Sequence, residues 1–246
     1  MTQPRAASAT EPGSTPTVVL VHGAWFGPWA WDRVREHLAA AGVPTETVSL
    51  PSVGEGLGGL TDDVAAVGRV LDGLDGPFVL VGHSYGGIPV TEAAAIRDDV
   101  AHVVYVCAFV VPVGTALLDA VGGEPPDWWI PAADGESITP AKPGEGFFGR
   151  CDPAVAEDAV SRLRRHSTRS VREPLRAAGY GRIPATYAVC TADALFPVAG
   201  QQANAELAGA RTRELDADHS PMLSRPADLA ALLAEVAGRS LPATSG

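Results

Sequence analysis

The chain has 246 residues, of which 46% are hydrophobic, and this suits one α/β domain with a full core and room for an insertion. Its formal charge of −11 argues against nucleic acid and anionic membrane surfaces as partners, and it makes a strongly anionic substrate unfavourable. The three cysteines, Cys107, Cys151 and Cys190, have neither a disulfide framework nor the C-x-x-C spacing of a metal site.

The first fifteen residues are polar and rich in Ala, Ser, Thr and Pro, and they lack the apolar core of a signal peptide. This composition predicts a disordered N-terminal arm. No apolar run along the chain is long enough to span a membrane. We therefore expect a cytoplasmic protein without a membrane partner.

Apolar runs and helical spacings alternate along most of the chain. Short buried strands are expected at residues 17–21, 45–50, 78–81, 102–106, 185–190 and 212–215. Helices are expected at residues 28–41, after a cap at Thr61, and at residues 88–96, 197–207 and 226–236. Strands that alternate with helices at this spacing predict a mostly parallel, doubly wound sheet with helices on both faces.

The alternation breaks over residues 112–181, which are rich in Trp, Phe and Pro. One helix is expected there, with Asp152 as its N-cap and Pro153 in its first turn. Because so many rings are costly to leave in water, we expect this stretch to form a cap, or lid, over the sheet. The predicted division is an arm at 1–15, a core at 16–111 and 182–240, and a cap at 112–181.

The third expected strand leads into Gly82-His83-Ser84-Tyr85-Gly86, which matches the G-x-S-x-G pattern. A strand, a sharp turn and a helix are the context that a nucleophile elbow requires, with the serine Oγ exposed at the tip of the turn. The helix N-terminus adds a positive partial charge beneath the reacting oxygen. We therefore take Ser84 as the candidate nucleophile.

A serine hydroxyl needs a base, and the base needs a carboxylate to set its tautomer. Among six histidines, His219 is the one that directly follows the last strand, at the same carboxyl edge of a parallel sheet as Ser84. Asp193 follows the preceding strand and lies at that edge too. Asp218 competes for the same role, but a residue adjacent to the base rarely reaches its neighbour's ring. The predicted triad is Ser84, Asp193 and His219.

The oxyanion that develops on the substrate needs two backbone N–H donors. Tyr85, next after the serine, supplies one. The loop after the first strand supplies the other, with Ala24 as the donor and Gly23 allowing a close approach of the backbone. The chain has neither a G-x-G-x-x-G opening a helix nor an H-E-x-x-H, so we expect no cofactor and no metal.

Taken together, these motifs resemble the branch of the α/β-hydrolase superfamily that holds plant methylesterases, salicylate-binding esterases, hydroxynitrile lyases and many small bacterial esterases. The segments that carry the resemblance are His22-Gly23-Ala24-Trp25, Gly82-His83-Ser84-Tyr85-Gly86-Gly87, Phe147-Phe148-Gly149, Val189-Cys190-Thr191-Ala192-Asp193 and Asp216-Ala217-Asp218-His219. The resemblance implies an α/β-hydrolase fold with a helical cap inserted after the fifth or sixth strand. It also implies a Ser-Asp-His triad in that chain order, an oxyanion hole from Ala24 and Tyr85, and no cofactor.

The lyases of this branch place a lysine beside the catalytic histidine and a threonine after the histidine of the first strand. Here the corresponding residues are Ser220 and Gly23, and the sole lysine, Lys142, lies in the expected cap. The dehalogenases and epoxide hydrolases of the wider fold use an aspartate nucleophile, where this chain has Ser84. The sequence therefore favours an esterase over these relatives.

The function expected is that of a serine carboxylesterase acting on a small to medium, largely neutral ester, in a protein that is a monomer or a homodimer. The expected apolar pocket draws on Trp25, Trp128, Trp129, Phe147, Phe148, Leu195, Phe196 and Met222. Two alternatives use the same pocket. One is a small-molecule receptor that turns over slowly or not at all, and the other is a biosynthetic enzyme that carries out acyl transfer or lactonisation.

Overall fold

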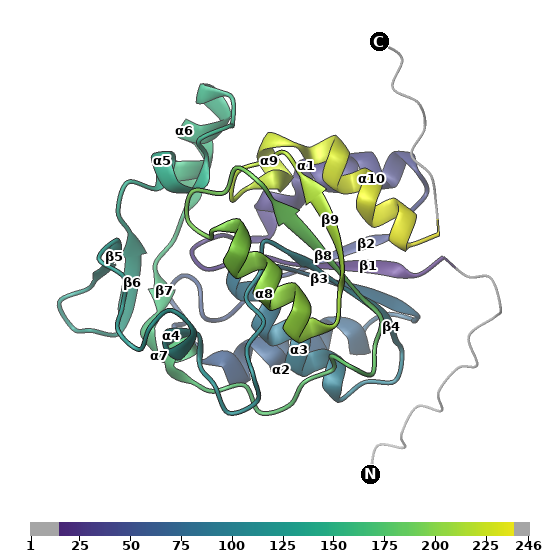
Figure 1. The fold of residues 1–246 in the computed structure, drawn as a ribbon, viewed down its shortest axis with the longest axis horizontal. Coiled ribbons are helices and arrows are strands. Elements are labelled where there is room, and N and C mark those ends of the chain that lie inside the picture. Colours follow the sequence, from purple (N-terminus) through teal and green to yellow (C-terminus); the bar gives the residue numbers. More distant parts are fainter. Residues whose placement is uncertain (1–14, 239–246) are drawn as a thin grey trace.

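The computed structural model describes residues 15–238, and within them six parallel strands form one twisted sheet (Figure 1). Their order across the sheet is β2-β1-β3-β4-β8-β9. The strands are β1 (Thr17–Val21), β2 (Thr45–Val48), β3 (Phe78–His83), β4 (Val100–Val106), β8 (Ala185–Cys190) and β9 (Arg211–Leu215). The mostly parallel sheet expected from the sequence is confirmed. The N-terminal arm expected at 1–15 lies, apart from its last residue, outside the described residues.

Strands at the centre of the sheet are buried on both faces, as their continuous apolar runs predict. Every residue of β3 and of β8 is buried, whereas most residues of β9 are exposed. The exposed strand β9 is an edge strand, and it carries arginines at positions 211 and 213. Charged residues on an edge disfavour pairing with another chain.

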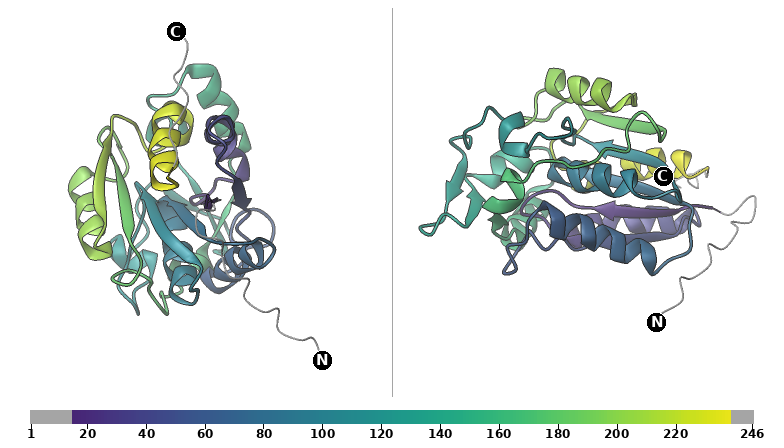
Figure 2. Two further views of the ribbon diagram at one scale, coloured as in Figure 1. Left: turned by 90° about the vertical axis from the view of Figure 1, so that its right-hand side faces the viewer. Right: turned by 90° about the horizontal axis from the view of Figure 1, so that it is seen from below.

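Helices cover both faces of the sheet, which makes it doubly wound. Two helices that pack against each other, α1 (Asp32–Ala40) and α10 (Pro226–Val236), lie on one face, and α8 (Val198–Ala208) lies on the other (Figure 2). The second face also carries α2 (Leu60–Asp72) and α3 (Gly87–Ala95), which pack together. Helix α2 begins one residue before Thr61, and its cap residue is Gly59.

The cap segment, defined as residues 112–181, follows the fourth strand of the sheet, β4. The expected insertion after the fifth or sixth strand is therefore wrong, because only four sheet strands precede the segment in the described chain. The segment is also less helical than expected, since it contains an antiparallel three-stranded sheet in the order β5-β6-β7. These strands are β5 (Trp129–Pro131), β6 (Ser137–Pro140) and β7 (His166–Ser167).

Four helices complete the cap segment, and three of them are short. They are α4 (Leu117–Ala120), α5 (Pro143–Phe147), α6 (Pro153–Arg162) and α7 (Thr168–Arg172). Helix α6 is the one expected from the sequence, and the Asp152 side chain accepts the Ala154 amide N–H at 3.0 Å, as a cap residue should. In Figure 1 the small sheet lies at the end of the molecule towards which β3 and β8 point.

Two short 3-10 turns and one helix lie next to the site described below. They are η1 (Pro28–Trp31), η2 (Ser84–Gly86) and α9 (Pro221–Ser224). Among the described residues, no helix combines the length and the apolar character needed to cross a bilayer.

Candidate active site

Ser84 lies at the sharp turn between β3 and α3, as the first residue of η2. Its φ angle is +51°, in the left-handed region that L-residues rarely adopt. The turn is close to the end of β1, because a Cβ on Gly86 would lie 2.5 Å from the carbonyl oxygen of His22. The strained serine and the glycine that the close approach requires are features of a nucleophile elbow.

His219 lies between Ser84 and Asp193 and contacts both. Its Nε2 is 3.0 Å from the Ser84 Oγ, and its Nδ1 is 2.6 Å from Oδ2 of Asp193. A carboxylate can only accept, so Nδ1 carries the proton and Nε2 is free to accept from the serine hydroxyl. All three side chains are buried or nearly so. The structure therefore brings together the three residues that the sequence analysis selected.

Asp193 is held in place by its own turn at the end of β8. Its second oxygen, Oδ1, accepts the amide N–H groups of Leu195 and Phe196 at 2.8 and 2.9 Å. Helix α8 begins later, with Pro197 as its cap residue, so Asp193 does not cap that helix. One carboxylate oxygen fixes the turn and the other remains directed at His219.

Asp218, the competing carboxylate, is occupied elsewhere. Its Oδ1 accepts the Ser220 amide at 3.1 Å and the Ser224 hydroxyl at 2.7 Å. Its Oδ2 accepts the Arg150 amide at 2.9 Å. These bonds join the loop that carries His219 to the cap segment and to α9.

The residues expected to supply the oxyanion hole, Ala24 and Tyr85, line the same cavity as Ser84 and His219. Gly23 precedes Ala24 at a point of close packing. A Cβ on Gly23 would lie 2.9 Å from the Ser84 Cβ, which is closer than real Cβ atoms come. The loop after β1 can therefore approach the serine only because residue 23 has no side chain.

Trp25, directly after Ala24, ties this loop to the cap segment. Its φ angle is +68°, a strained value for a bulky residue. Its indole N–H donates to the Ile138 carbonyl on β6 at 2.9 Å, and its own carbonyl accepts the Arg164 amide at 2.9 Å. Contacts from the cap segment thus hold the strained backbone beside the Ala24 amide.

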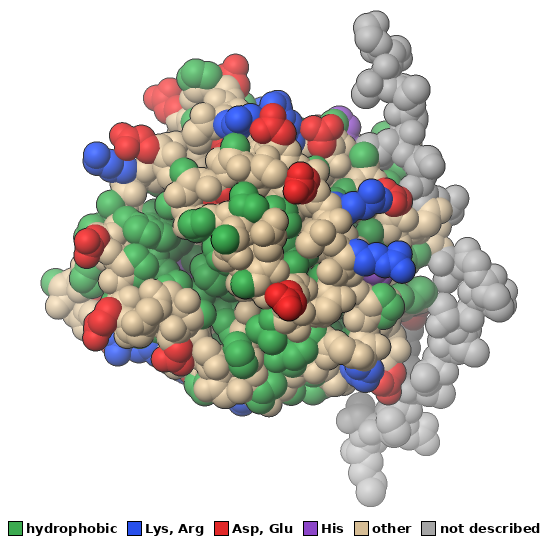
Figure 3. Space-filling view, in the orientation of Figure 1, with side chains coloured by type: hydrophobic (Ala, Val, Ile, Leu, Met, Phe, Trp, Pro, Cys, Tyr) green, Lys and Arg blue, Asp and Glu red, His purple; other side chains and the backbone are tan. Residues whose placement is uncertain are grey.

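A cavity of about 250 Å³ opens above Ser84. Its walls are formed by Ala24, Trp25, Ser84, Tyr85, Phe109, Leu117, Ala120, Val121, Pro126, Trp128, Trp129, Phe147, Leu195, Phe196 and His219. Figure 3 shows hydrophobic side chains gathered around a hollow between the cap segment and the α8 side of the core. The lining contains neither lysine, arginine, aspartate nor glutamate.

Six of the eight expected pocket residues line this cavity, and Phe148 and Met222 do not. The Phe148 ring is buried against Phe26, with ring centroids 5.8 Å apart, and it packs behind Phe147. Met222 is fully buried in α9. Phe147 lines the cavity, and the adjacent Phe148 ring packs into the core. Met222 lies between Pro221 and Leu223, which are also buried, so this part of α9 belongs to the core.

Five further residues of the lining were not expected from the sequence, and they come from the segment after β4 and from the first part of the cap segment. These are Phe109, Leu117, Ala120, Val121 and Pro126. The apolar spacing of Leu117, Ala120 and Val121 is the signal that could have identified α4 as a wall of the pocket.

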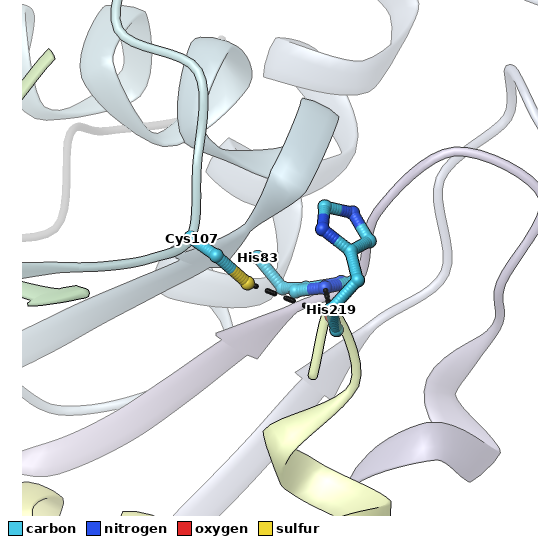
Figure 4. Close-up of side chains that lie close together, drawn as sticks. All are labelled: His83, Cys107 and His219. Atoms are coloured by element: carbon cyan, nitrogen blue, oxygen red, sulfur yellow. Dashed lines mark hydrogen bonds between the residues drawn. The ribbon is translucent and has the colours of Figure 1, made fainter. Parts of the chain in front are cut away.

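His83, Cys107 and His219 form a buried group whose side-chain ligand atoms lie within 4.8 Å of one another (Figure 4). The His83 Nε2 lies 2.7 Å from the carbonyl oxygen of His219, and the Cys107 Sγ donates to the same oxygen at 3.5 Å. Both ring nitrogens of His219 are engaged by Ser84 and Asp193. The group therefore surrounds a backbone carbonyl and fixes the His219 loop, which is not the arrangement of a metal centre.

In a comparison with protein families, residues 18–232 match the model described as the alpha/beta hydrolase family. Among curated proteins, Alpha/beta hydrolase nvfD of Aspergillus novofumigatus is 28% identical over 250 residues, covering 92% of this chain and 98% of the relative. Methylesterase 7 of Arabidopsis thaliana is 29% identical over 251 residues, covering 90% of this chain and 96% of the relative.

Among solved structures, a pyrethroid hydrolase from Sphingobium faniae is similar to this chain with a TM-score of 0.78 and 23% identity. The match covers 92% of this chain and 98% of that one. At this level of identity the likeness shows the fold.

Proposed function

The chain belongs to the alpha/beta hydrolase family, and on that basis we propose that it is a serine carboxylesterase that hydrolyses a small to medium, largely neutral ester. The observation that carries the proposal is the continuous chain of hydrogen bonds from Ser84 through His219 to Asp193, at 3.0 and 2.6 Å, on the floor of an apolar cavity. Similarity to plant methylesterases supports ester bonds as the target.

In the proposed reaction, the Ser84 Oγ attacks the ester carbonyl and the His219 Nε2 takes its proton. Asp193 holds the Nδ1 proton and stabilises the imidazolium as it forms. The amides of Ala24 and Tyr85 stabilise the negative charge on the former carbonyl oxygen. His219 then returns the proton to the leaving alcohol, and water releases the acid from the acyl-enzyme by the same steps.

The lining of the cavity supports a neutral substrate. It contains no lysine, arginine, aspartate or glutamate, so a charged acyl or alcohol group would lose its hydration without a partner of opposite charge. It also has no lysine or arginine to hold a leaving cyanide ion, and Ser220 stands beside His219 where a lyase has lysine. Ester hydrolysis therefore fits the pocket better than cyanohydrin cleavage.

Replacing Ser84 by Ala tests the proposal directly. A panel of 4-nitrophenyl and methyl esters of increasing acyl size should be hydrolysed by the wild type, and Ser84→Ala should lower kcat by about a thousandfold or more. The residual rate would come from the oxyanion hole and from binding alone.

Ser220→Ala is the matched control, because Ser220 is buried next to His219 and its Oγ has no hydrogen-bond partner among the described residues. It removes a hydroxyl from the same region without touching the proposed triad. Retention of more than about a tenth of the activity in Ser84→Ala would refute the nucleophile. Binding of esters without turnover by the wild type would favour the receptor alternative.

A further inference from the structure

The amide that the proposed function uses as an oxyanion donor belongs to the peptide between Ser84 and Tyr85. The carbonyl of this peptide accepts the Phe109 amide N–H at 3.0 Å. Because a trans peptide is planar and its C=O and N–H point in opposite directions, the Tyr85 N–H points away from Phe109. One end of the peptide plane is therefore fixed by the segment after β4.

On the other side of this peptide lies Tyr85, whose side chain is almost fully buried. The Tyr85 hydroxyl donates to Oδ2 of Asp63 at 2.6 Å. The other oxygen of Asp63, Oδ1, accepts the Ser52 amide N–H at 2.9 Å. Asp63 itself is 0% exposed and lies in the first turn of α2, where the positive end of the helix supports a carboxylate.

We propose that Asp63 is a positioning residue, which holds the Tyr85 side chain and thereby the Tyr85 amide in the geometry that stabilises the oxyanion. The inference rests on the proposed function, and it adds a residue that lies outside the cavity and outside the triad. The bond from Tyr85 to Asp63 crosses 22 positions in the chain and joins α2 to the elbow.

The bond from Tyr85 to Asp63 also restrains the backbone of the elbow. Ser84 is held at a φ angle of +51°, so the turn relaxes unless its surroundings prevent it. Rotation of the peptide that follows Ser84 would turn the Tyr85 N–H away from the substrate. A short bond to a buried carboxylate is suited to resist that rotation, because charge-assisted hydrogen bonds are stronger than neutral ones.

The ionisation of the pair agrees with these roles. Burial and the nearby Asp63 carboxyl raise the pKa of the Tyr85 phenol well above its usual value, so the phenol keeps its proton and donates. Burial raises the pKa of Asp63 to about 6, against hydrogen bonds from Tyr85 and Ser52 that lower it. Asp63 is then mostly a carboxylate at neutral pH and above.

The cap segment packs against the same pair. The His166 ring on β7 meets the Tyr85 ring edge-on, with centroids 4.8 Å apart, and the His166 Nε2 lies 2.9 Å from the Ser170 hydroxyl on α7. Burial lowers the pKa of His166 to about 3, so it faces the pair as a neutral ring. The pair is thus enclosed on the core side by α2 and on the other side by the cap segment.

The test compares Tyr85→Phe and Asp63→Asn with the wild type at about pH 8, where Asp63 is ionised. Tyr85→Phe keeps the backbone amide and the ring and removes the bond. We expect kcat for a 4-nitrophenyl ester to fall by about tenfold or more, with KM within about twofold, because the interaction is made in the transition state. The double variant should be no slower than the slower single variant, because both changes act on the same bond: Tyr85→Phe removes it, and Asp63→Asn removes the charge that strengthens it.

Tyr105→Phe is the matched control. The Tyr105 ring is also buried, and its hydroxyl lies 2.9 Å from the Thr91 hydroxyl on α3, so its removal leaves the bond from Tyr85 to Asp63 in place. A role limited to stability would lower the melting temperature of Tyr85→Phe and Tyr105→Phe alike and leave kcat unchanged in both. If Tyr85→Phe does not fold, kcat and KM of Asp63→Asn are compared with those of the wild type and of Tyr105→Phe.

A second readout uses a fluorophosphonate probe, which needs no knowledge of the natural ester. The Ser84 Oγ forms a bond to phosphorus, fluoride leaves, His219 takes the serine proton, and the phosphoryl oxygen occupies the oxyanion hole. The inactivation rate should fall in both variants by about the same factor as kcat. Equal rates in the wild type, the variants and Tyr105→Phe would overturn the inference and leave the proposed function standing. A wild type that neither hydrolyses esters nor reacts with the probe would overturn both.

Discussion

At the scale of single residues, His219 has an aspartate beside it in the chain and another beside it in space. Asp193 is 26 positions away in sequence and its Oδ2 is 2.6 Å from the His219 Nδ1. Asp218 is adjacent in sequence, and its two oxygens accept backbone amides and a serine hydroxyl. A buried carboxylate that accepts several bonds of this kind holds a loop in place and has no oxygen left for the ring.

Replacing each aspartate by asparagine should therefore give different results. Asp193→Asn should lower kcat by about a thousandfold or more with little change in melting temperature, because the amide leaves His219 in the wrong tautomer. Asp218→Asn should lower the melting temperature and reduce kcat far less. Steady-state kinetics with a 4-nitrophenyl ester and thermal melts of both variants measure the two effects. A damaging Asp218→Asn beside a mild Asp193→Asn would show that the carboxylate is wrongly assigned.

At the scale of elements, the core was more predictable from the sequence than the cap segment. The strands β1 and β8 and the helix α10 begin and end where their apolar patterns and terminal prolines indicate. Each carries a strong local signal, namely a continuous apolar run or a helical period with a proline at its start. The triad follows from signals of the same kind, since the parallel strands β3, β8 and β9 bring the ends that precede Ser84, Asp193 and His219 to one edge of the sheet.

The cap segment lacks such signals. Strands β5, β6 and β7 have three, four and two residues, and β7 is separated from β6 by two helices. Strands this short cannot display a period, and their pairing depends on contacts distant in sequence. The bond from Tyr85 to Asp63 could not be predicted from the sequence either, because it too depends on a contact between residues distant in the chain. Tyr85 follows the serine and Asp63 lies in the first turn of a helix, and neither position indicates a partner in the other.

Among the aromatic rings of the cap segment, those that line the cavity should affect which acyl group the enzyme prefers. Trp128 lines the cavity and stands 5.6 Å from the Trp25 ring, whereas Phe148 lies outside the lining. Trp128→Ala should raise KM more than it lowers kcat and shift preference towards bulkier acyl groups, because a wall residue binds substrate and transition state about equally. The acyl-chain profile of kcat/KM measures this.

Phe148→Ala is the control for that experiment. It should cost about 3 kcal/mol or more of stability, as for other buried phenylalanines, and leave the acyl-chain profile unchanged. The same profile in wild type and Trp128→Ala, with only a lower melting temperature, would mean that the ring packs within the cap segment and does not select the substrate.

At the scale of the whole molecule, three buried histidines link stability to pH. Burial lowers the pKa of His22 to about 4 and of His166 to about 3, and it lowers the pKa of His83 well below its usual value. In the unfolded chain each would titrate near 6.5. Between these values the unfolded state binds more protons than the folded state, so the free energy of unfolding must fall as the pH falls. Asp63 acts in the opposite direction, since its pKa is raised to about 6 and the folded state takes up its proton first.

The free energy of unfolding should therefore be steady above about pH 7 and decrease towards pH 4, because three histidines outweigh one aspartate. His22 alone accounts for about 3 kcal/mol over this range, from a shift between 6.5 and about 4. Asp63→Asn removes the opposing group, so its stability should fall more steeply with acid than that of the wild type, by up to about 3 kcal/mol near pH 4. Urea unfolding of both proteins at steps of pH measures the two slopes. A flat wild-type curve would mean that the buried histidines are protonated in the folded state, and a shallower slope in Asp63→Asn would mean that Asp63 is ionised there throughout.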